Sequence, residues 1–461
     1  MLKKYIGDKK FYRFVLAIAV PIMLQNGITN FVNMLDNIMV GRVGTAAMTG
    51  VSVSNQLILI FNLCLFGAVS GVGIFGAQFY GKNDQQGLRY SLRFKFVVCS
   101  VLTVGGLVLF LTFGNSLIMQ YLKDEENPQE IALAFDSARN YLAVMLIGFI
   151  PFAVTQCYSS TLRETGETAL PMKASFIAVA VNLSFNMVLI FGIKPLGIPA
   201  LGSLGAAIAT VISRFVEAAI VVLWTHLHKN KNPYVEGLFK DFRIPINLCF
   251  DILKKETPLI LNETLWAAGI AIINQCYSER GVNVVAANNI NQTFWNLFSV
   301  VFIATGSAIG IIIGNMLGAG KLNEVMDTAR KLISFGLMSS IGMGLIFAAL
   351  APFIPYLYNT EQEVRHIATQ LMVVSAVMMP FDSLAHSSYF TIRSGGKSLI
   401  TFIFDCGFMW AVQVPLAFCL SRFTDIPILS LFIAVQIAHS IKGLLGIVMV
   451  KKVNWIKNIV D

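Results

Sequence analysis

The sequence is short of charge. Only 13% of its 461 residues are Asp, Glu, Lys or Arg, whereas soluble domains carry roughly a quarter. Hydrophobic residues make up 56%, the mean hydropathy is +0.70, and long apolar runs recur from end to end. The formal net charge of +9 could suggest a nucleic-acid partner, but the basic residues lie between the apolar runs. The composition therefore indicates a protein embedded in a bilayer.

The patterns typical of disulfide-stapled proteins and of metal-dependent enzymes are also missing. The seven cysteines are scattered, mostly inside apolar runs, and no C-x-x-C or H-E-x-x-H motif occurs. This excludes a disulfide framework or a zinc knuckle on the usual spacings. The longest polar stretch runs from His226 to Glu256, which is too short for a soluble catalytic domain. We expect no organic cofactor, and no metal other than Na⁺.

The apolar runs predict twelve spans, all helical, because hydrocarbon offers backbone N–H and C=O groups no other partner. The fold class is therefore an all-α polytopic membrane protein. The predicted spans are 14–36, 50–76, 94–117, 138–160, 171–193, 200–226, 257–278, 285–311, 332–354, 366–390, 398–420 and 427–450.

The basic residues predict the orientation. The loops that share a side with the two termini carry 25 of the 34 Lys and Arg residues, and the opposite loops carry seven. Because Lys and Arg collect in cytoplasmic loops, we expect both termini in the cytoplasm of a multi-pass plasma-membrane protein.

The chain contains an internal repeat. At a shift of 237 residues Pro21 falls on Pro258 and Gly81 on Gly318, and at a shift of 230 LRETGET at 162–168 falls on IRSGGKS at 392–398. Six spans per repeat make the second half a parallel copy of the first. We therefore predict an N-lobe (1–226), a cytoplasmic linker (227–256) and a C-lobe (257–461), two six-helix lobes with a cleft suited to alternating access.

Acidic residues inside spans are costly and are therefore functional candidates. In the N-lobe, Asp36 ends the first predicted span. Asn182 and Asn186 lie four residues apart, on one helix face, and Thr210 in the next span can join them. One carboxylate with amide and hydroxyl oxygens could hold Na⁺ or a proton-linked water cluster. The alternative is interhelical hydrogen bonding.

The C-lobe carries three candidate acids, Glu263, Asp382 and Asp405, for binding a cation, a proton or the substrate. Buried structural pairing is the alternative for each. Arg214 and Glu217 lie three residues apart on one helix and are expected to neutralise each other. His386 and His439 lack metal-ligand spacing, so packing is the favoured interpretation for both. Polar residues expected to line a cavity are Gln25, Asn33, Gln275, Asn288 and Gln292.

Several segments together resemble the multidrug and toxic compound extrusion (MATE) family over essentially the whole chain. They are PIMLQNGITNFVNMLDNIMVGRVG (21–44), NLSFNMVLIFG (182–192), LGAAIAT (204–210), and MMPFD (378–382) leading into IRSGGKS. The resemblance implies a secondary antiporter that exports cationic or amphipathic organic compounds against H⁺ or Na⁺.

The resemblance also carries site residues over. The family's N-lobe cation site falls on Asp36, Asn182, Asn186 and Thr210. Many members have Asp where this chain has Asn186, so one negative charge is missing here. The C-lobe acids match Glu263 and Asp382, and Asp405 is included by its position and chemistry. We expect a monomer with small-molecule organic cations or amphiphiles as substrates.

Three alternative classes share some of these features. A lipid-linked oligosaccharide or polysaccharide flippase of the same superfamily would be expected to show a basic cavity for phosphate, whereas the intramembrane charges here are mainly acidic. An intramembrane enzyme would need a nucleophile–base or metal constellation. A major-facilitator transporter also has two parallel halves, but its glycine- and arginine-rich loop signature does not occur.

Overall fold

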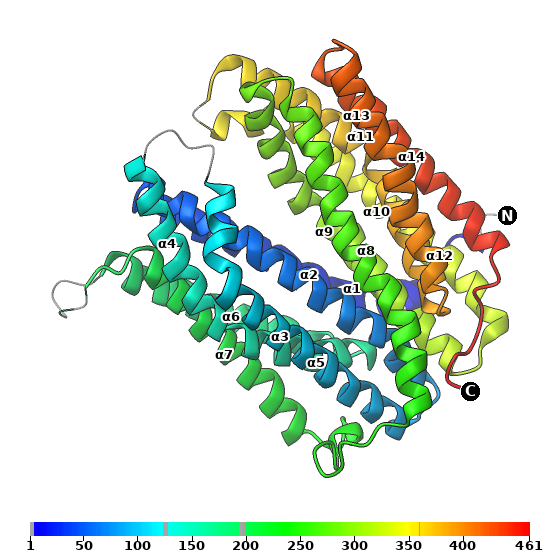
Figure 1. The fold of residues 1–461 in the computed structure, drawn as a ribbon. Coiled ribbons are helices and arrows are strands. Elements are labelled where there is room, and N and C mark those ends of the chain that lie inside the picture. Colours follow the sequence, from blue (N-terminus) through cyan, green and yellow to red (C-terminus); the bar gives the residue numbers. More distant parts are fainter. Residues whose placement is uncertain (1–3, 123–127, 193–196, 198, 359) are drawn as a thin grey trace. The chain divides into compact units, whose positions relative to one another are not determined.

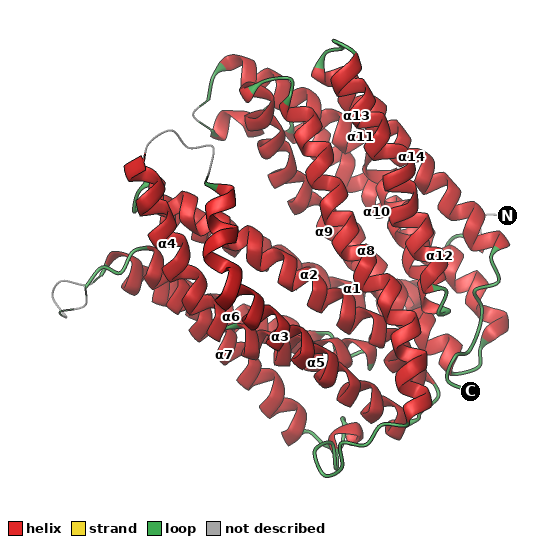
Figure 2. Cartoon of the chain, viewed as in Figure 1, coloured by secondary structure: helices red, strands yellow, loops and turns green. Residues whose placement is uncertain are grey.

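The computed structural model describes residues 4–122, 128–192, 197, 199–358 and 360–461. Throughout this part of the chain, helices alternate with short loops and no strand is present (Figure 2). The first half contains α1 (Lys9–Gly41), α2 (Thr45–Gly81), α3 (Gln85–Tyr121), α4 (Pro128–Ile147), α5 (Phe149–Glu164), α6 (Ala169–Phe191), α7 (Ser203–Leu227) and the short η3 (Pro233–Val235).

The second half follows the same plan. It contains α8 (Ile246–Ser278), α9 (Val282–Gly318), α10 (Leu322–Leu350), η4 (Ile354–Leu357), α11 (Gln362–Ser394), α12 (Ser398–Phe402), the π-helical turns η5 (Ile403–Gly407) and η6 (Met409–Gln413), α13 (Val414–Phe423) and α14 (Ile428–Lys452).

The helices match the twelve predicted spans. Ten described segments are long and apolar enough to cross a membrane, and the bent pair α4–α5 makes an eleventh. The one remaining predicted span, 257–278, falls on α8, whose polar Asn262 and Glu263 reduce its hydropathy. The predicted all-helical, twelve-span fold is confirmed, and its helices extend several residues beyond most of the predicted spans.

The helix boundaries confirm the repeat. Helices α1 and α8 both have 33 residues and begin 237 residues apart. Helices α2 and α9 both have 37 residues at the same shift. Helices α7 and α14 both have 25 residues, at a shift of 225. The two halves thus share a helical plan, while the shorter α10 and the shorter loop before α14 reduce the shift along the chain.

The described chain packs as two compact units. Unit 1 comprises Met1–Met23, Ala77–Asp84 and Ile252–Asp461, and unit 2 comprises Leu24–Gly76 and Gln85–Asp251. In unit 2, α7 packs against α4, α5 and α6 (Figure 1). In unit 1, α11 packs against α9, α10 and α14. The proposed lobe and linker boundaries at 226 and 256 stay a prediction.

One predicted span is broken at a proline. Helix α4 ends at Ile147, and α5 leaves it at an angle of 47°. Pro151 lacks the N–H that would bond the Ile147 carbonyl, and its ring crowds that carbonyl, which explains the break. The equivalent helix α11 contains Pro380 and yet is continuous from Gln362 to Ser394.

Inside unit 1, the end of α2 crosses the end of α9 through residues that the repeat makes equivalent. A Cβ on Gly314 would lie 2.8 Å from the Ala77 side chain. A Cβ on Gly81 would overlap the Asn315 carbonyl, and one on Gly318 would overlap the Gln78 carbonyl. These two positions must be glycine because backbone meets backbone there. The crossing therefore has the local two-fold symmetry expected of a parallel repeat.

A buried ion pair in unit 2 shows how the two halves differ. The Lys95 ammonium lies 2.6 Å from the Glu164 carboxylate, and both side chains are almost completely buried. A Cβ on Gly76 would overlap the same carboxylate, so glycine makes room for it. In the second half the equivalent positions hold Leu332, Ser394 and Ile313, all buried. The same contact is ionic in one half and neutral in the other.

We predict that Lys95→Leu alone destabilises the protein by about 3–5 kcal/mol, because it leaves the Glu164 carboxylate buried and unpaired. Lys95→Leu combined with Glu164→Ser copies the second half and should recover most of that loss. Thermal unfolding of the purified protein in detergent measures both changes. A single variant as stable as the parent would show that the ion pair does not hold this contact.

Candidate functional site

The four predicted N-lobe site residues lie together in unit 2. The Asn186 Nδ2 donates to the Asp36 carboxylate at 2.6 Å and to the Asn182 Oδ1 at 3.1 Å. The Asn182 Nδ2 donates in turn to the Thr210 hydroxyl at 3.2 Å. The i, i+4 spacing of the two asparagines on α6 places them between α1 and α7. The predicted cluster is thus formed, while its role as a cation site stays a prediction.

The cluster holds its carboxylate with neutral groups. Asn186 is completely buried and Asn182 nearly so. The Asn186 Oδ1 has no hydrogen-bond partner among the described residues, and buried amide oxygens normally have one. A carboxylate beside an unsatisfied amide oxygen is an arrangement that a cation or a proton would complete. Position 186 holds an amide, so Asp36 supplies the one carboxylate of this cluster.

Two further polar residues of the first half lie outside this cluster. Gln25 donates through Nε2 to the Ser175 hydroxyl at 2.8 Å. The Ser175 hydroxyl donates to the Glu217 carboxylate. The side chain of Asn33 lies outside the part of the chain that the structure describes.

The expected Arg214–Glu217 ion pair is not formed. The Arg214 guanidinium instead donates to the Gly148 carbonyl at 3.3 Å and lies 4.8 Å from the centre of the Phe152 ring. Tertiary contacts across α5 and α6 therefore override the local i, i+3 pairing that the sequence predicts.

In unit 1, Asp405 is neutralised by a base that sequence reasoning missed. The Lys442 ammonium lies 2.6 Å from the Asp405 Oδ1, and the Asn262 Nδ2 donates to Oδ2 at 2.9 Å. Asp405 belongs to the π-helical turn η5, a distortion often found at functional sites. Because Lys442 and Asn262 occupy both of its carboxylate oxygens, Asp405 is already paired within the protein.

Asp382 forms the next part of the same polar region. Its carboxylate lies 3.2 Å from the His439 Nε2, and the other ring nitrogen of His439 is 2.7 Å from the Gln413 amide. His439 thus contacts an acid, contrary to the packing role that the sequence favoured. Its i, i+3 spacing to Lys442 on α14 is the signal that could have identified both residues.

Glu263 differs from both of these acids. It is partly buried, and no hydrogen bond or ion pair to its side chain is present among the described residues. The charged groups that act on it are Arg393 and Asp405. Of the three predicted acids of the second half, Glu263 therefore has the carboxylate that is free to bind a ligand.

The predicted cavity-lining residues of the second half meet at a residue that was not predicted. Asn288 and Gln292 on α9 both donate to the Asn274 Oδ1 on α8, at 3.1 and 2.7 Å. Gln275, the neighbour of Asn274, is exposed. Asn288 and Gln292 therefore bridge two helices, and their side-chain amides are already engaged.

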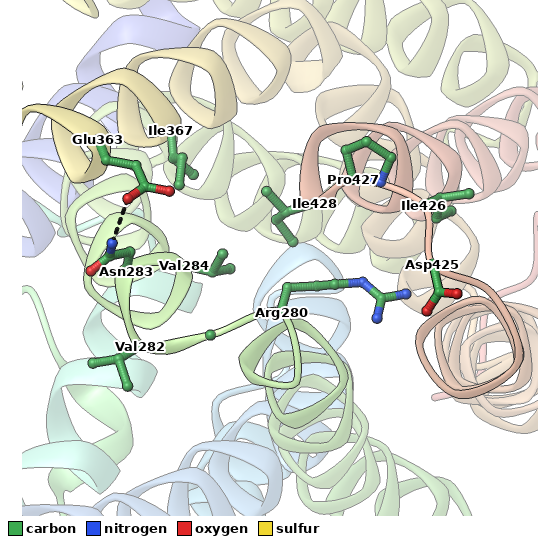
Figure 3. Close-up of a pocket in the computed structure, with 11 residues that line it drawn as sticks. Arg280, Val282, Asn283, Val284, Glu363, Ile367, Asp425, Ile426, Pro427 and Ile428 are labelled. Carbon is green, nitrogen blue, oxygen red and sulfur yellow. Dashed lines mark hydrogen bonds between the residues drawn. The ribbon is translucent and has the colours of Figure 1, made fainter.

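A pocket of about 460 Å³ opens at the loops that join α8 to α9 and α13 to α14 in unit 1. Figure 3 shows the Arg280 guanidinium pointing toward Asp425, and the Asn283 amide bound to Glu363 at 2.8 Å. Arg280 also donates to the carbonyls of Leu420 and Thr424. None of the predicted site residues lines this pocket.

Helices long and apolar enough to cross a membrane, arranged in two equivalent halves, define a polytopic membrane protein. The chain matches the MatE family over residues 21–188 and 258–419, one match in each half. It therefore belongs to the MatE family of membrane transporters.

Individual relatives cover nearly the whole chain. "Probable multidrug resistance protein YoeA" of Bacillus subtilis is 25% identical over 433 residues, which cover 92% of this chain and 90% of the relative. "Probable multidrug resistance protein NorM" of Thermotoga maritima is 22% identical, with 91% and 88% covered.

Solved structures show the same fold. A MOP superfamily transporter from Pyrococcus furiosus superposes with a TM-score of 0.84 at 18% identity, covering 98% of this chain and 97% of that one. A mutant of the Vibrio cholerae MATE transporter VcmN superposes with a TM-score of 0.81 at 19% identity, covering 99% and 100%.

We predict that Asn186→Asp tightens Na⁺ binding by at least about tenfold, because a second carboxylate strengthens the attraction for a cation. Since a ligand that binds the folded state stabilises it, melting in NaCl against choline chloride gives the affinity. The control is Asp36→Asn combined with Asn186→Asp, which keeps one carboxylate. Equal Na⁺ responses in Asn186→Asp and the parent would remove this cluster as a cation site.

Proposed function

We propose that this protein is a secondary antiporter of the plasma membrane, which exports cationic or amphipathic organic compounds in exchange for H⁺ or Na⁺. The observation that carries the proposal is the Asp36 cluster, in which the neutral Asn186 amide holds the carboxylate and the oxygen of that buried amide lacks a partner among the described residues. The relatives named as multidrug resistance proteins support the substrate class.

The coupling follows from the energetics of a buried charge. A carboxylate is disfavoured in a dry environment unless a proton or a cation neutralises it. Binding of the coupling ion therefore favours a conformation in which the acid is enclosed. Release of the ion favours a conformation that opens the acid to water or to an organic cation. Exchange results only if the two conformations bind these ligands with different affinities.

The two halves contribute separate candidate sites to this cycle. In the first half, Asp36 with Asn182, Asn186 and Thr210 binds the coupling ion. In the second half, Glu263 and Asp382 are the candidates that bind the coupling ion or the substrate. The excess of Lys and Arg in alternate loops supports cytoplasmic termini. In the proposed cycle the ion enters the cell down its gradient and the organic compound leaves. We propose that the antiporter functions as a monomer.

We predict that proteoliposomes containing the protein export a fluorescent organic cation only when a proton or sodium gradient is imposed. Asp36→Asn and Glu263→Gln should each reduce gradient-driven export by at least about tenfold, because each removes a carboxylate that binds an ion or the substrate. The matched control is Glu236→Gln, which removes an exposed acid from the loop after α7. Export that proceeds at the same rate without any gradient would contradict the antiport mechanism.

A further inference from the structure

Both halves of the protein contain a polar triad, three linked side chains that connect three helical segments. In unit 2, Gln25 on α1 donates to the Ser175 hydroxyl on α6 at 2.8 Å, and Ser175 donates to Glu217 on α7. In unit 1, Asn262 on α8 donates to Asp405 in η5 at 2.9 Å, and Asp405 pairs with Lys442 on α14 at 2.6 Å.

The repeat makes these two polar triads equivalent, residue by residue. Gln25 corresponds to Asn262 at the shift of 237 that relates α1 to α8. Ser175 corresponds to Asp405 at the shift of 230 that relates LRETGET to IRSGGKS. Glu217 corresponds to Lys442 at the shift of 225 given by the equal bounds of α7 and α14.

The two polar triads differ in chemistry at their second and third residues. In the second half an acid and a base occupy these positions, so the net charge of that triad is zero. In the first half a hydroxyl and an acid occupy them, and Glu217 stands where the second half has the ammonium of Lys442. An ionised Glu217 therefore leaves a net negative charge at a place where the other half has none.

The surroundings of Glu217 support both of its charge states. Burial opposes the carboxylate, whereas the charges of Arg214 on α7 and Arg163 on α5 support it from a distance. The hydrogen-bond partner of Glu217 among the described residues is Ser175, and Arg214 donates instead to the Gly148 carbonyl at 3.3 Å. The neutral Ser175 on α6 contacts Glu217, and the neutral Gln25 on α1 contacts Ser175. On α4, the Tyr141 hydroxyl donates to Asn55 at 3.3 Å.

We propose that Glu217 is a second proton-binding carboxylate of the first half, in addition to Asp36, and that Ser175 and Gln25 report its state to α1. When a proton from water binds a Glu217 oxygen, the new O–H donates to the Ser175 oxygen. The Ser175 hydroxyl then turns to donate to the Gln25 amide oxygen, and the amide group turns with it. No bond other than the O–H bond forms or breaks, and the net charge rises by one.

Proton binding by Glu217 does not rest on the proposed function, but its use in exchange does. If it is used, the first half takes up a proton at the position where the second half carries a permanent ammonium.

Infrared difference spectra between acidic and alkaline pH test the proposal on the purified protein in lipid, without transport. The spectrum should contain a protonated-carboxyl band that Glu217→Gln abolishes and Glu217→Asp retains at a shifted position. Ser175→Ala should shift the same band, because it removes the hydrogen-bond partner. The control is Asp405→Asn combined with Lys442→Met, which removes the ion pair of the other half. It should leave the protonated-carboxyl band unchanged.

Two results would overturn the proposal. One is a band that persists unaltered in Glu217→Gln and Ser175→Ala. The other is a band that Na⁺ displaces when choline chloride is replaced by NaCl, which would assign the site to sodium. If Glu217→Gln does not fold, the band positions of Glu217→Asp and Ser175→Ala decide. Failure of antiport in liposomes would leave the infrared result standing, so the two proposals fail separately.

Discussion

The hydrocarbon interior of the bilayer imposes the constraint on which this structure depends: a charge placed there must be compensated. The protein meets this constraint in two ways. Lys95–Glu164 and Asp405–Lys442 are ion pairs built from the chain itself. Asp36 and Glu217 are held only by amide and hydroxyl groups. The first kind is complete as folded, whereas the second kind has no ion-pair partner among the described residues, which is the basis of the proposed ion binding.

The internal repeat distributes these two kinds of acid between the halves. The helical plan is the same in both, down to the glycines where α2 crosses α9. At the α3–α5 contact the first half has the ion pair, and the second half has leucine and serine. At the polar triad the second half has the Asp405–Lys442 ion pair, and the first half has Glu217 without a basic ion-pair partner among the described residues. Duplication thus supplies one scaffold, and substitutions give each half its own electrostatics.

Much of the fold was predictable from the sequence, because long apolar runs and their flanking charges report directly on spans. The helix bounds of α1 and α8 repeat the shift of 237 that Pro21 and Pro258 already show. The Asp36 cluster was predictable in part because Asn182 and Asn186 share a face of one helix. The π-helical turns around Asp405 leave no comparable periodic signal. A proline alone does not predict the break at Gly148, since Pro380 lies within the continuous helix α11.

The partners of the acids were harder to predict, because they come from helices distant in the sequence. Lys442 and His439 lie 37 and 57 residues from Asp405 and Asp382. The local rule that pairs residues three apart gave the wrong partner for Glu217, since Arg214 reaches the carbonyl at the helix break instead. Neighbours in the sequence therefore did not predict the partners of these acids, which are set by contacts between distant helices.

The central claim is that carboxylates held by neutral groups bind an ion that the organic substrate displaces. Calorimetric titration of the purified protein with an organic cation, in buffers of different ionisation enthalpy, tests it most directly. The account predicts a binding heat that varies with the buffer, because protons are released, or an affinity that falls as Na⁺ is raised. Binding that is insensitive to both the buffer and Na⁺ would contradict it.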